Sequence, residues 1–117
     1  MFTLKNSVKL IGHIADMPEV KRTENGKTMA RLRIGTKENF RDSNGEKTSE
    51  TQWHRLVAWG KTAEIIQQYL KKGSHVAIDG KLVHRSYTDR EGLKRYVTEI
   101  QVNEMLMLDS KVPAVIA

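Results

Sequence analysis

Two tryptophans in one short segment are the side chains of this chain that are best suited to hold a partner. They stand in the run W-H-R-L-V-A-W, and residues two apart share a face of a β-strand. One face therefore carries Trp53, Arg55, Val57 and Trp59, and the other carries His54, Leu56 and Ala58. Burying the pair would also bury Arg55, which is costly without a partner. Aromatic rings interleaved with a guanidinium suit a flat, stackable, anionic partner, as unpaired bases on a phosphate backbone are.

Two further aromatics stand in polar, basic surroundings where a core side chain would be unusual. Phe40 follows Glu38 and Asn39 at the end of one predicted strand, and Tyr87 follows Arg85 and Ser86 at the end of another. The alternative is that each packs under its own loop. The two other tyrosines, Tyr69 and Tyr96, are predicted to be structural.

Enzymatic chemistry is the first rival to binding, and the sequence argues against it. The acidic residues are concentrated in predicted turns, the four histidines lack zinc-ligand spacing, and no P-loop or G-x-S-x-G motif occurs. The chain has no cysteine, which excludes thiol chemistry and cysteine-based zinc sites. We therefore predict no enzyme, no metal site and no cofactor. An adaptor or RNA-binding module is the second rival, because stacking alone does not separate DNA from RNA.

Size and charge are compatible with a binding domain. A length of 117 residues corresponds to one domain with a single modest core. The net charge of +6 favours an anionic partner without establishing one. The amino terminus lacks the apolar stretch of a secretory signal, and no window approaches the roughly 18 apolar residues of a membrane span. These features predict an intracellular location.

Strand signals dominate the element pattern. A strand is predicted over residues 8–14, and two Asn-Gly pairs, Asn25-Gly26 and Asn44-Gly45, predict hairpins that join the first three strands into a meander. The period then changes to helical over residues 61–72, and Gly73 supplies a stop. Strand pattern resumes over residues 75–87 and, after a turn at residues 89–92, over residues 96–102.

Three strands, one helix and two strands are the layout of an all-β fold, the five-stranded OB-fold Greek-key barrel, with its helix between strands 3 and 4. Glycines inside the long strands, Gly12, Gly35 and Gly80, are expected where a small barrel bends sharply. An α+β sheet with one packing helix is the alternative, since element order alone does not close a barrel.

Several segments resemble the bacterial single-stranded DNA-binding protein family, in order and at family spacing from about residue 6 to about residue 108. They are N-S-V-K-L-I-G at residues 6–12, P-E-V at 18–20, T-Q-W-H-R at 51–55, W-G-K at 59–61, Y-L-K-K-G-S at 69–74 and Y-T-D at 87–89. The resemblance implies an OB-fold homotetramer in the bacterial cytoplasm, associated with the nucleoid. It implies binding of single-stranded DNA without sequence specificity, which protects the strand in replication, recombination and repair.

The resemblance also implies roles for individual residues. The base-stacking aromatics of the family match Phe40, Trp53, Trp59 and Tyr87, and its phosphate-facing basic residues match Arg55, Lys61, Lys72 and Arg85. Arg33 belongs with them because it alternates with core residues on the basic face of the second strand. The family position of His54 lies near subunit contacts, so His54 is assigned to assembly.

The predicted domain covers residues 1–108, and residues 109–117 form a short tail. Family members usually continue into a flexible linker with an acidic, hydrophobic tip that recruits replication proteins. The last residues of this sequence, K-V-P-A-V-I-A, contain no acidic cluster. Recruitment through an acidic tail is therefore not supported by this sequence.

Overall fold

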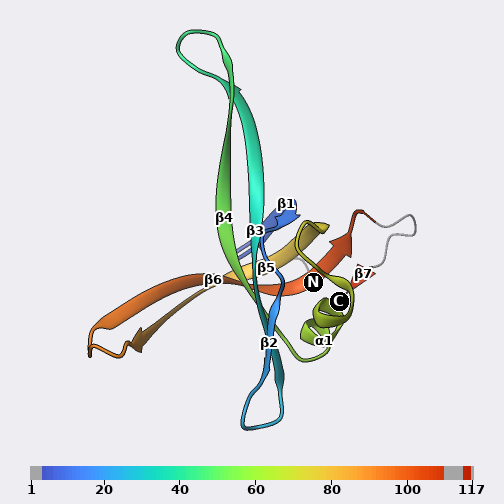
Figure 1. The fold of residues 1–117 in the computed structure, drawn as a ribbon, viewed down its shortest axis with the longest axis vertical. Coiled ribbons are helices and arrows are strands. Elements are labelled where there is room, and N and C mark those ends of the chain that lie inside the picture. Colours follow the sequence, from blue (N-terminus) through green and yellow to red (C-terminus); the bar gives the residue numbers. More distant parts are fainter. Residues whose placement is uncertain (1–3, 110–114, 117) are drawn as a thin grey trace.

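Strands make up most of the computed structural model, which describes residues 4–109 and 115–116. The elements are β1 (Val8–Ile14), β2 (Glu19–Arg22), β3 (Thr28–Arg41), β4 (Lys47–Trp59), α1 (Gly60–Tyr69), β5 (His75–Thr88), β6 (Lys94–Met107) and β7 (Val115–Ile116) (Figure 1). Strands β1 and β2, separated by the segment 15–18, together take the place of the first predicted strand. With β1 and β2 counted as one strand, and apart from the two-residue β7, the order is the predicted one of three strands, a helix and two strands.

The sheet closes on itself as a barrel. Strand β5 pairs with β1 and β6, and β3 pairs with β4, all antiparallel. The parallel pairing of Leu56 with Ile100 joins β4 to β6, and the pairing of His13 with Gly35 joins β1 to β3. These contacts complete the ring β1-β5-β6-β4-β3, which confirms the predicted OB-fold barrel and excludes the open α+β sheet.

The barrel closes where β1 and β3 pass close to each other, at Gly12 of β1 and Gly35 of β3. A Cβ atom on Gly12 would overlap the carbonyl oxygen of Gly35, so β1 and β3 can approach this closely only because residue 12 has no side chain. Gly80 is crowded in the same way by the carbonyl oxygen of Gln101, beside a register shift between β5 and β6. The sharp bends predicted at Gly12 and Gly80 thus coincide with close backbone approaches.

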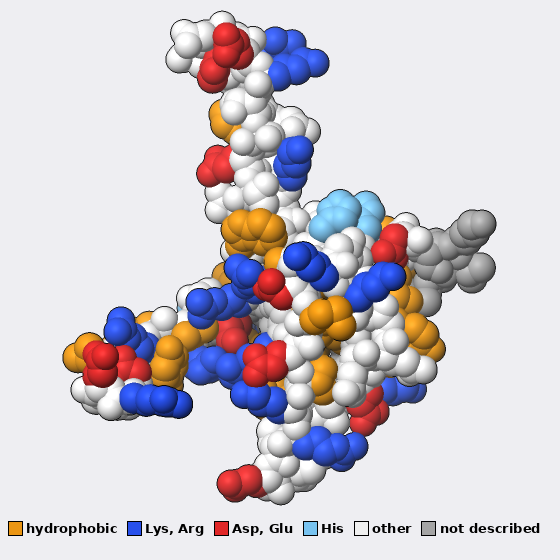
Figure 2. Space-filling model, in the orientation of Figure 1, with side chains coloured by type: hydrophobic (Ala, Val, Ile, Leu, Met, Phe, Trp, Pro, Cys, Tyr) orange, Lys and Arg blue, Asp and Glu red, His pale blue; other side chains and the backbone are white. Residues whose placement is uncertain are grey.

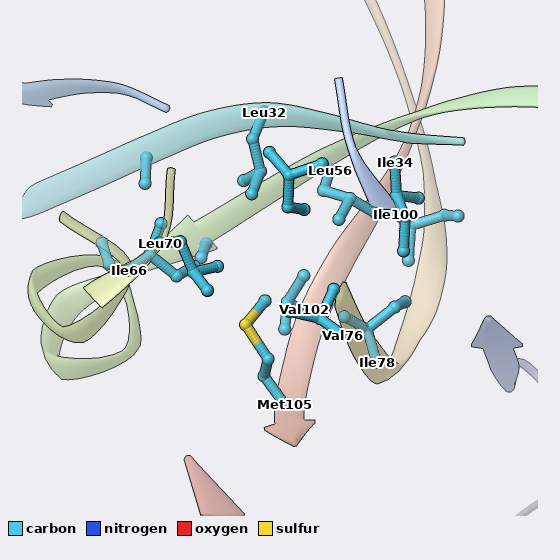
Figure 3. Close-up of a cluster of buried hydrophobic side chains, with 14 residues drawn as sticks. Leu32, Ile34, Leu56, Ile66, Leu70, Val76, Ile78, Ile100, Val102 and Met105 are labelled. Atoms are coloured by element: carbon cyan, nitrogen blue, oxygen red, sulfur yellow. The ribbon is translucent and has the colours of Figure 1, made fainter. Parts of the chain in front are cut away.

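The core fills the barrel and the space under the helix (Figure 3). Leu32, Ile34 and Leu56 from β3 and β4 meet Val76, Ile78, Ile100, Val102 and Met105 from β5 and β6, while Ile66 and Leu70 come from the α1 side. All ten are at most 5% exposed. Alternate residues of each strand supply this core, which leaves their neighbours free to face outwards.

The predicted helix end was wrong by three residues. Helix α1 ends at Tyr69, and Leu70 is already extended, with φ of −93° and ψ of 145°. Extension turns the Leu70 side chain into the core, where it is 3% exposed. A turn follows in which the Lys71 amide donates to the Ser74 hydroxyl at 3.1 Å. Burial of Leu70 thus outweighs continuation of the helix to Lys72.

Two long hairpins extend from the barrel as arms (Figure 1). The outer parts of β3 and β4 form one arm, and those of β5 and β6 form the other. The first arm ends in a turn in which the Asp42 amide donates to the Glu46 carbonyl oxygen at 2.9 Å, with Gly45 at a φ of 79°. The second turns at residues 89–92, as predicted. A hydrogen bond from Arg95, aided by backbone amides, lowers the pKa of Asp89 and stabilises its ionised form at this turn.

The predicted tail falls largely outside the described residues, which leave out 110–114 and 117. The prediction that the sequence carries no acidic recruitment tip concerns this part of the chain. Within the described part, Val115 and Ile116 form β7, which pairs with Leu106 and Met105 of β6. No helix among the described residues is long and apolar enough to cross a membrane.

Candidate nucleic-acid interface

Trp53 is held in place by its neighbours while much of its ring stays open to solvent. It is paired with Gly35 on β3, and a Cβ atom at Gly35 would lie 2.5 Å from ring atom Cζ3 of Trp53. The guanidinium carbon of Arg33 lies 5.7 Å from the centre of the ring. With 57% of the residue exposed, one ring surface is fixed on the barrel and the other is available for stacking.

The second tryptophan is separated from the first by a buried residue. Val57, expected on the same accessible face, is only 6% exposed because β4 there pairs with both β3 and β6. Trp59 is 41% exposed at the end of β4, where it is paired with Met29 and precedes helix α1. The sequence predicted one continuous accessible face. The structure instead has two exposed aromatic sites, Trp53 and Trp59, with the buried Val57 between them.

Tyr87 repeats the arrangement found at Trp53. It is 47% exposed, and the guanidinium carbon of Arg85 lies 5.7 Å from its ring centre. Arg85 is in turn held by Glu99, whose Oε1 accepts from Arg85 Nε at 2.7 Å. This hydrogen bond raises the pKa of the Arg85 guanidinium, although partial burial opposes the shift. The arm β5–β6 thus presents an aromatic ring beside a fixed cation.

Phe40 lies apart from the other three aromatics. It is 47% exposed on the arm β3–β4, opposite Thr48. Gly35, which Trp53 covers, is five positions nearer the barrel on the same strand, so Phe40 lies further out along the arm than Trp53.

Four arginines line a cleft between the roots of the two arms, together with three carboxylates. The basic residues are Arg31, Arg33, Arg55 and Arg85, and the acidic ones are Asp16, Glu19 and Glu99. On the face shown in Figure 2, basic and acidic side chains gather where the arms leave the barrel. Sequence reasoning selected three of these arginines but missed Arg31 and all three acids. Arg31 could have been found, since it is two residues from Arg33 and so lies on the same face of the strand.

The two remaining predicted basic residues do not join this cleft. Lys61 lies in the first turn of α1 and Lys72 beyond its last turn, so the length of the helix separates them. Both are exposed, and Lys61 is close in sequence to Trp59.

Two tyrosines predicted to be structural are exposed. Tyr69 is 56% exposed at the end of α1, and Tyr96 is 77% exposed on β6. The amine of Lys94 lies 5.6 Å from the centre of the Tyr96 ring. Tyr96 is paired with Ser86 rather than with Tyr87, so it faces the other side of the arm from Tyr87. Tyr96 was predicted to be structural, but it lies where β6 has left the barrel, so it has no core to pack against (Figure 1).

His54, predicted to act in assembly, is half-buried on β4. Its Nε2 atom lies 2.9 Å from the Thr36 hydroxyl oxygen on β3, within hydrogen-bond distance. By strand alternation it faces away from Trp53 and Arg55, as predicted. Its assignment to assembly stays a prediction.

The closed barrel and its exposed aromatic and basic side chains define an OB-fold protein with a surface suited to nucleic acid. Residues 5–108 match the model of the single-strand binding protein family. The chain belongs to this family.

A curated relative and a solved structure are similar to the chain over most of its length. Single-stranded DNA-binding protein 1 of Chlorobaculum tepidum is 47% identical over 107 residues, which cover 91% of this chain and 66% of the relative. The chain therefore spans slightly less than two thirds of that relative. A Plasmodium falciparum SSB structure in complex with ssDNA matches with a TM-score of 0.82 and 30% identity, covering 93% of this chain and 99% of that one.

Proposed function

We propose that this protein binds single-stranded DNA without sequence specificity and protects it during replication, recombination and repair. The observation that carries the proposal is the repeated pair of an exposed aromatic ring and an adjacent guanidinium, Trp53 with Arg33 and Tyr87 with Arg85. Rings stack on any base and cations neutralise phosphates, so this pairing tolerates every sequence. The named function of the Chlorobaculum relative and the ssDNA in the Plasmodium complex support it.

The proposed binding residues are the ones predicted from the sequence together with Arg31. Trp53 and Tyr87 form the central stacking positions, Trp59 an additional one, and Phe40 the outermost. Because Phe40 lies further out on its arm than Trp53, a strand that stacks on both rings must follow the arm outwards from the barrel. The proposal therefore includes a DNA path along β3–β4.

The proposed activity is binding without catalysis. Among residues 4–109 and 115–116, no group of three or more metal-binding side chains is close enough to hold a metal ion. Membership of a family of DNA binders is the main support. We place the protein in the bacterial cytoplasm, with the nucleoid DNA that such a binder would meet.

A salt series of poly-dT titrations, followed by tryptophan fluorescence, tests this function. We expect strong quenching by poly-dT, because bases would stack on the two tryptophans, and weak quenching by duplex DNA, whose bases have no free faces. The logarithm of affinity should fall with the logarithm of salt concentration by about 0.7 per phosphate contact. Equal binding of duplex would refute the proposal. Tighter binding of a matched RNA strand would favour the RNA-binding alternative.

We also propose that the protein assembles as a homotetramer, as the family resemblance implies. The support in this chain is an open strand edge. Strand β1 pairs with β5 over residues 8–13, but with β3 only at His13 and Ile14. Most of its second edge thus has no partner among the described residues, and Ile11 beside it is 62% exposed. An unpaired edge with an exposed apolar residue is suited to pair with a second copy.

Sedimentation equilibrium tests the assembly. We expect the mass of four chains at micromolar concentration, and a smaller species for Ile11→Lys, because a charge would then have to be buried at the β1 edge. Leu93→Lys, which places the same charge on an exposed apolar residue at the turn of the arm β5–β6, away from the β1 edge, is the control. A monomeric mass for the unaltered protein would contradict the proposal.

A further inference from the structure

The four arginines of the cleft differ in whether a carboxylate already holds them. Arg33 donates to Asp16 Oδ2 from both Nη2, at 2.6 Å, and Nε, at 3.0 Å. Arg85 is held by Glu99 as described above. Within the described part of the chain, Arg31 and Arg55 have no carboxylate within salt-bridge distance, and Arg31 Nε is buried without a hydrogen-bond partner.

The two carboxylates that hold an arginine also differ from each other. The side chain of Glu99 is 6% exposed on β6, whereas that of Asp16 is 58% exposed in the segment between β1 and β2. If Glu99 lost Arg85, it would be a buried charge without its partner, which is strongly unfavourable. Asp16 can exchange Arg33 for water at little cost, since exposed ion pairs are weak. Glu99 is thus a fixed partner, and Asp16 is an exchangeable one.

The position of Asp16 keeps it beside Arg33. The amide of Ala15 donates to the carbonyl oxygen of Arg33 at 2.9 Å, which anchors the segment on β3. The third acid of the cleft, Glu19, is already engaged, because Lys21 Nζ lies 3.0 Å from its carboxylate. A phosphate that approached Arg33 would therefore meet the Asp16 carboxylate directly.

We propose that Asp16 is an internal counterion that competes with DNA phosphate for Arg33, while Glu99 is a positioning residue that holds Arg85 beside Tyr87. This inference rests on the proposed function. A phosphate would first find Arg31 and Arg55 open and would then displace Asp16 from Arg33. The displaced carboxylate stays near the bound phosphate and repels it. The protein thus limits its own affinity for single strands, which favours release.

Asp16→Asn tests the competition, because it removes the negative charge and keeps the size of an exposed side chain. We expect dT oligonucleotides to bind roughly three- to tenfold more tightly at low salt. In the unaltered protein, the displaced Asp16 carboxylate would take up a cation from solution, and asparagine would take up none. We therefore expect the slope of the logarithm of affinity against the logarithm of salt concentration to become steeper by up to about 0.7. Fluorescence anisotropy of a labelled oligonucleotide measures both quantities.

Asp79→Asn is the matched control, because it makes the same change of net charge. Asp79 is paired with Lys9 Nζ at 2.8 Å, between β1 and β5 and outside the cleft. We expect it to change affinity by less than about twofold, because Asp79 does not line the cleft and its ion pair is with Lys9 rather than with a cleft arginine. Affinity of Asp16→Asn no higher than that of Asp79→Asn would overturn the proposal. Failure of the unaltered protein to bind single strands would instead refute the proposed function.

Two further variants separate competition from positioning. In an Arg33→Gln background, Asp16→Asn should lose most of its effect, because the carboxylate acts through Arg33. If Asp16→Asn strengthened binding in the Arg33→Gln background as much as in the unaltered protein, Asp16 would act by general repulsion of DNA, and the proposal would be overturned. Glu99→Gln should weaken binding, opposite in sign to Asp16→Asn, provided that circular dichroism shows an intact fold. Tighter binding by a folded Glu99→Gln protein would refute the positioning role.

Discussion

Replacing Trp53 with alanine is expected to weaken the binding of poly-dT by about 1–3 kcal/mol, whatever the base sequence of the strand. The ring is fixed on Gly35 and beside Arg33, so a base can stack on it without first ordering the side chain. Trp59→Ala should cost at least about 1 kcal/mol, because Trp59 is also exposed, although less so. Anisotropy titrations with labelled dT, mixed-sequence and dA strands measure the losses.

Tyr69→Ala is the control for these two substitutions. Tyr69 is as exposed as Trp53, at 56% against 57%, but it lies at the end of α1 and on neither arm. Removing it should leave affinity within about twofold of the unaltered protein. If Trp53→Ala and Trp59→Ala both bind poly-dT as tightly as Tyr69→Ala does, stacking on this strand does not contribute to binding.

Replacing Gly12 with alanine is expected to destabilise the fold by about 1–3 kcal/mol or more. The new Cβ atom would overlap the backbone of Gly35, and a backbone atom between paired strands cannot move aside as a side chain can. The two strands must therefore separate where β1 closes the barrel. Since Trp53 packs on Gly35, binding should weaken as well. Urea unfolding followed by circular dichroism measures the stability change.

Gly26→Ala separates this overlap from simple backbone strain. Gly26 is in an exposed turn with a φ of 80°, and a Cβ atom there would meet nothing within 4 Å. Its replacement should cost only about 1 kcal/mol, the usual penalty for a left-handed residue with a side chain. Destabilisation by Gly12→Ala that is no larger than that by Gly26→Ala would contradict the close approach at the barrel closure.

The local sequence pattern was sufficient to predict most of the fold. The Asn-Gly pairs at residues 25–26 and 44–45 lie in the hairpin turns where they were predicted, because a left-handed glycine is needed at the turn itself. The change of period after Gly60 identified the helix. The helix end at Tyr69 was missed because it depends on burial of Leu70 in the core, a contact with residues far away in the sequence.

The candidate site was predictable to a lesser extent, for the same reason. Exposure of Trp53, Trp59, Phe40 and Tyr87 followed from their polar or alternating neighbours. Burial of Val57 did not, because it results from the pairing of β4 with β6, some forty residues apart in the chain. The exposure of Tyr96 was missed as well. It lies where the arm has left the barrel, so alternation no longer separates core from solvent.

The sequence by itself determined which side chains this protein can offer to a strand of nucleic acid, because residue type and alternation along a strand are local properties. Only the tertiary structure decided how these side chains are combined. The register of the β3–β4 and β5–β6 hairpins set Arg33 beside Trp53 and Glu99 beside Arg85, and the closing contact of β1 with β3 brought Asp16 to Arg33. Such pairs depend on how the strands are aligned with one another, and that alignment is fixed only when the strands pack around a common core.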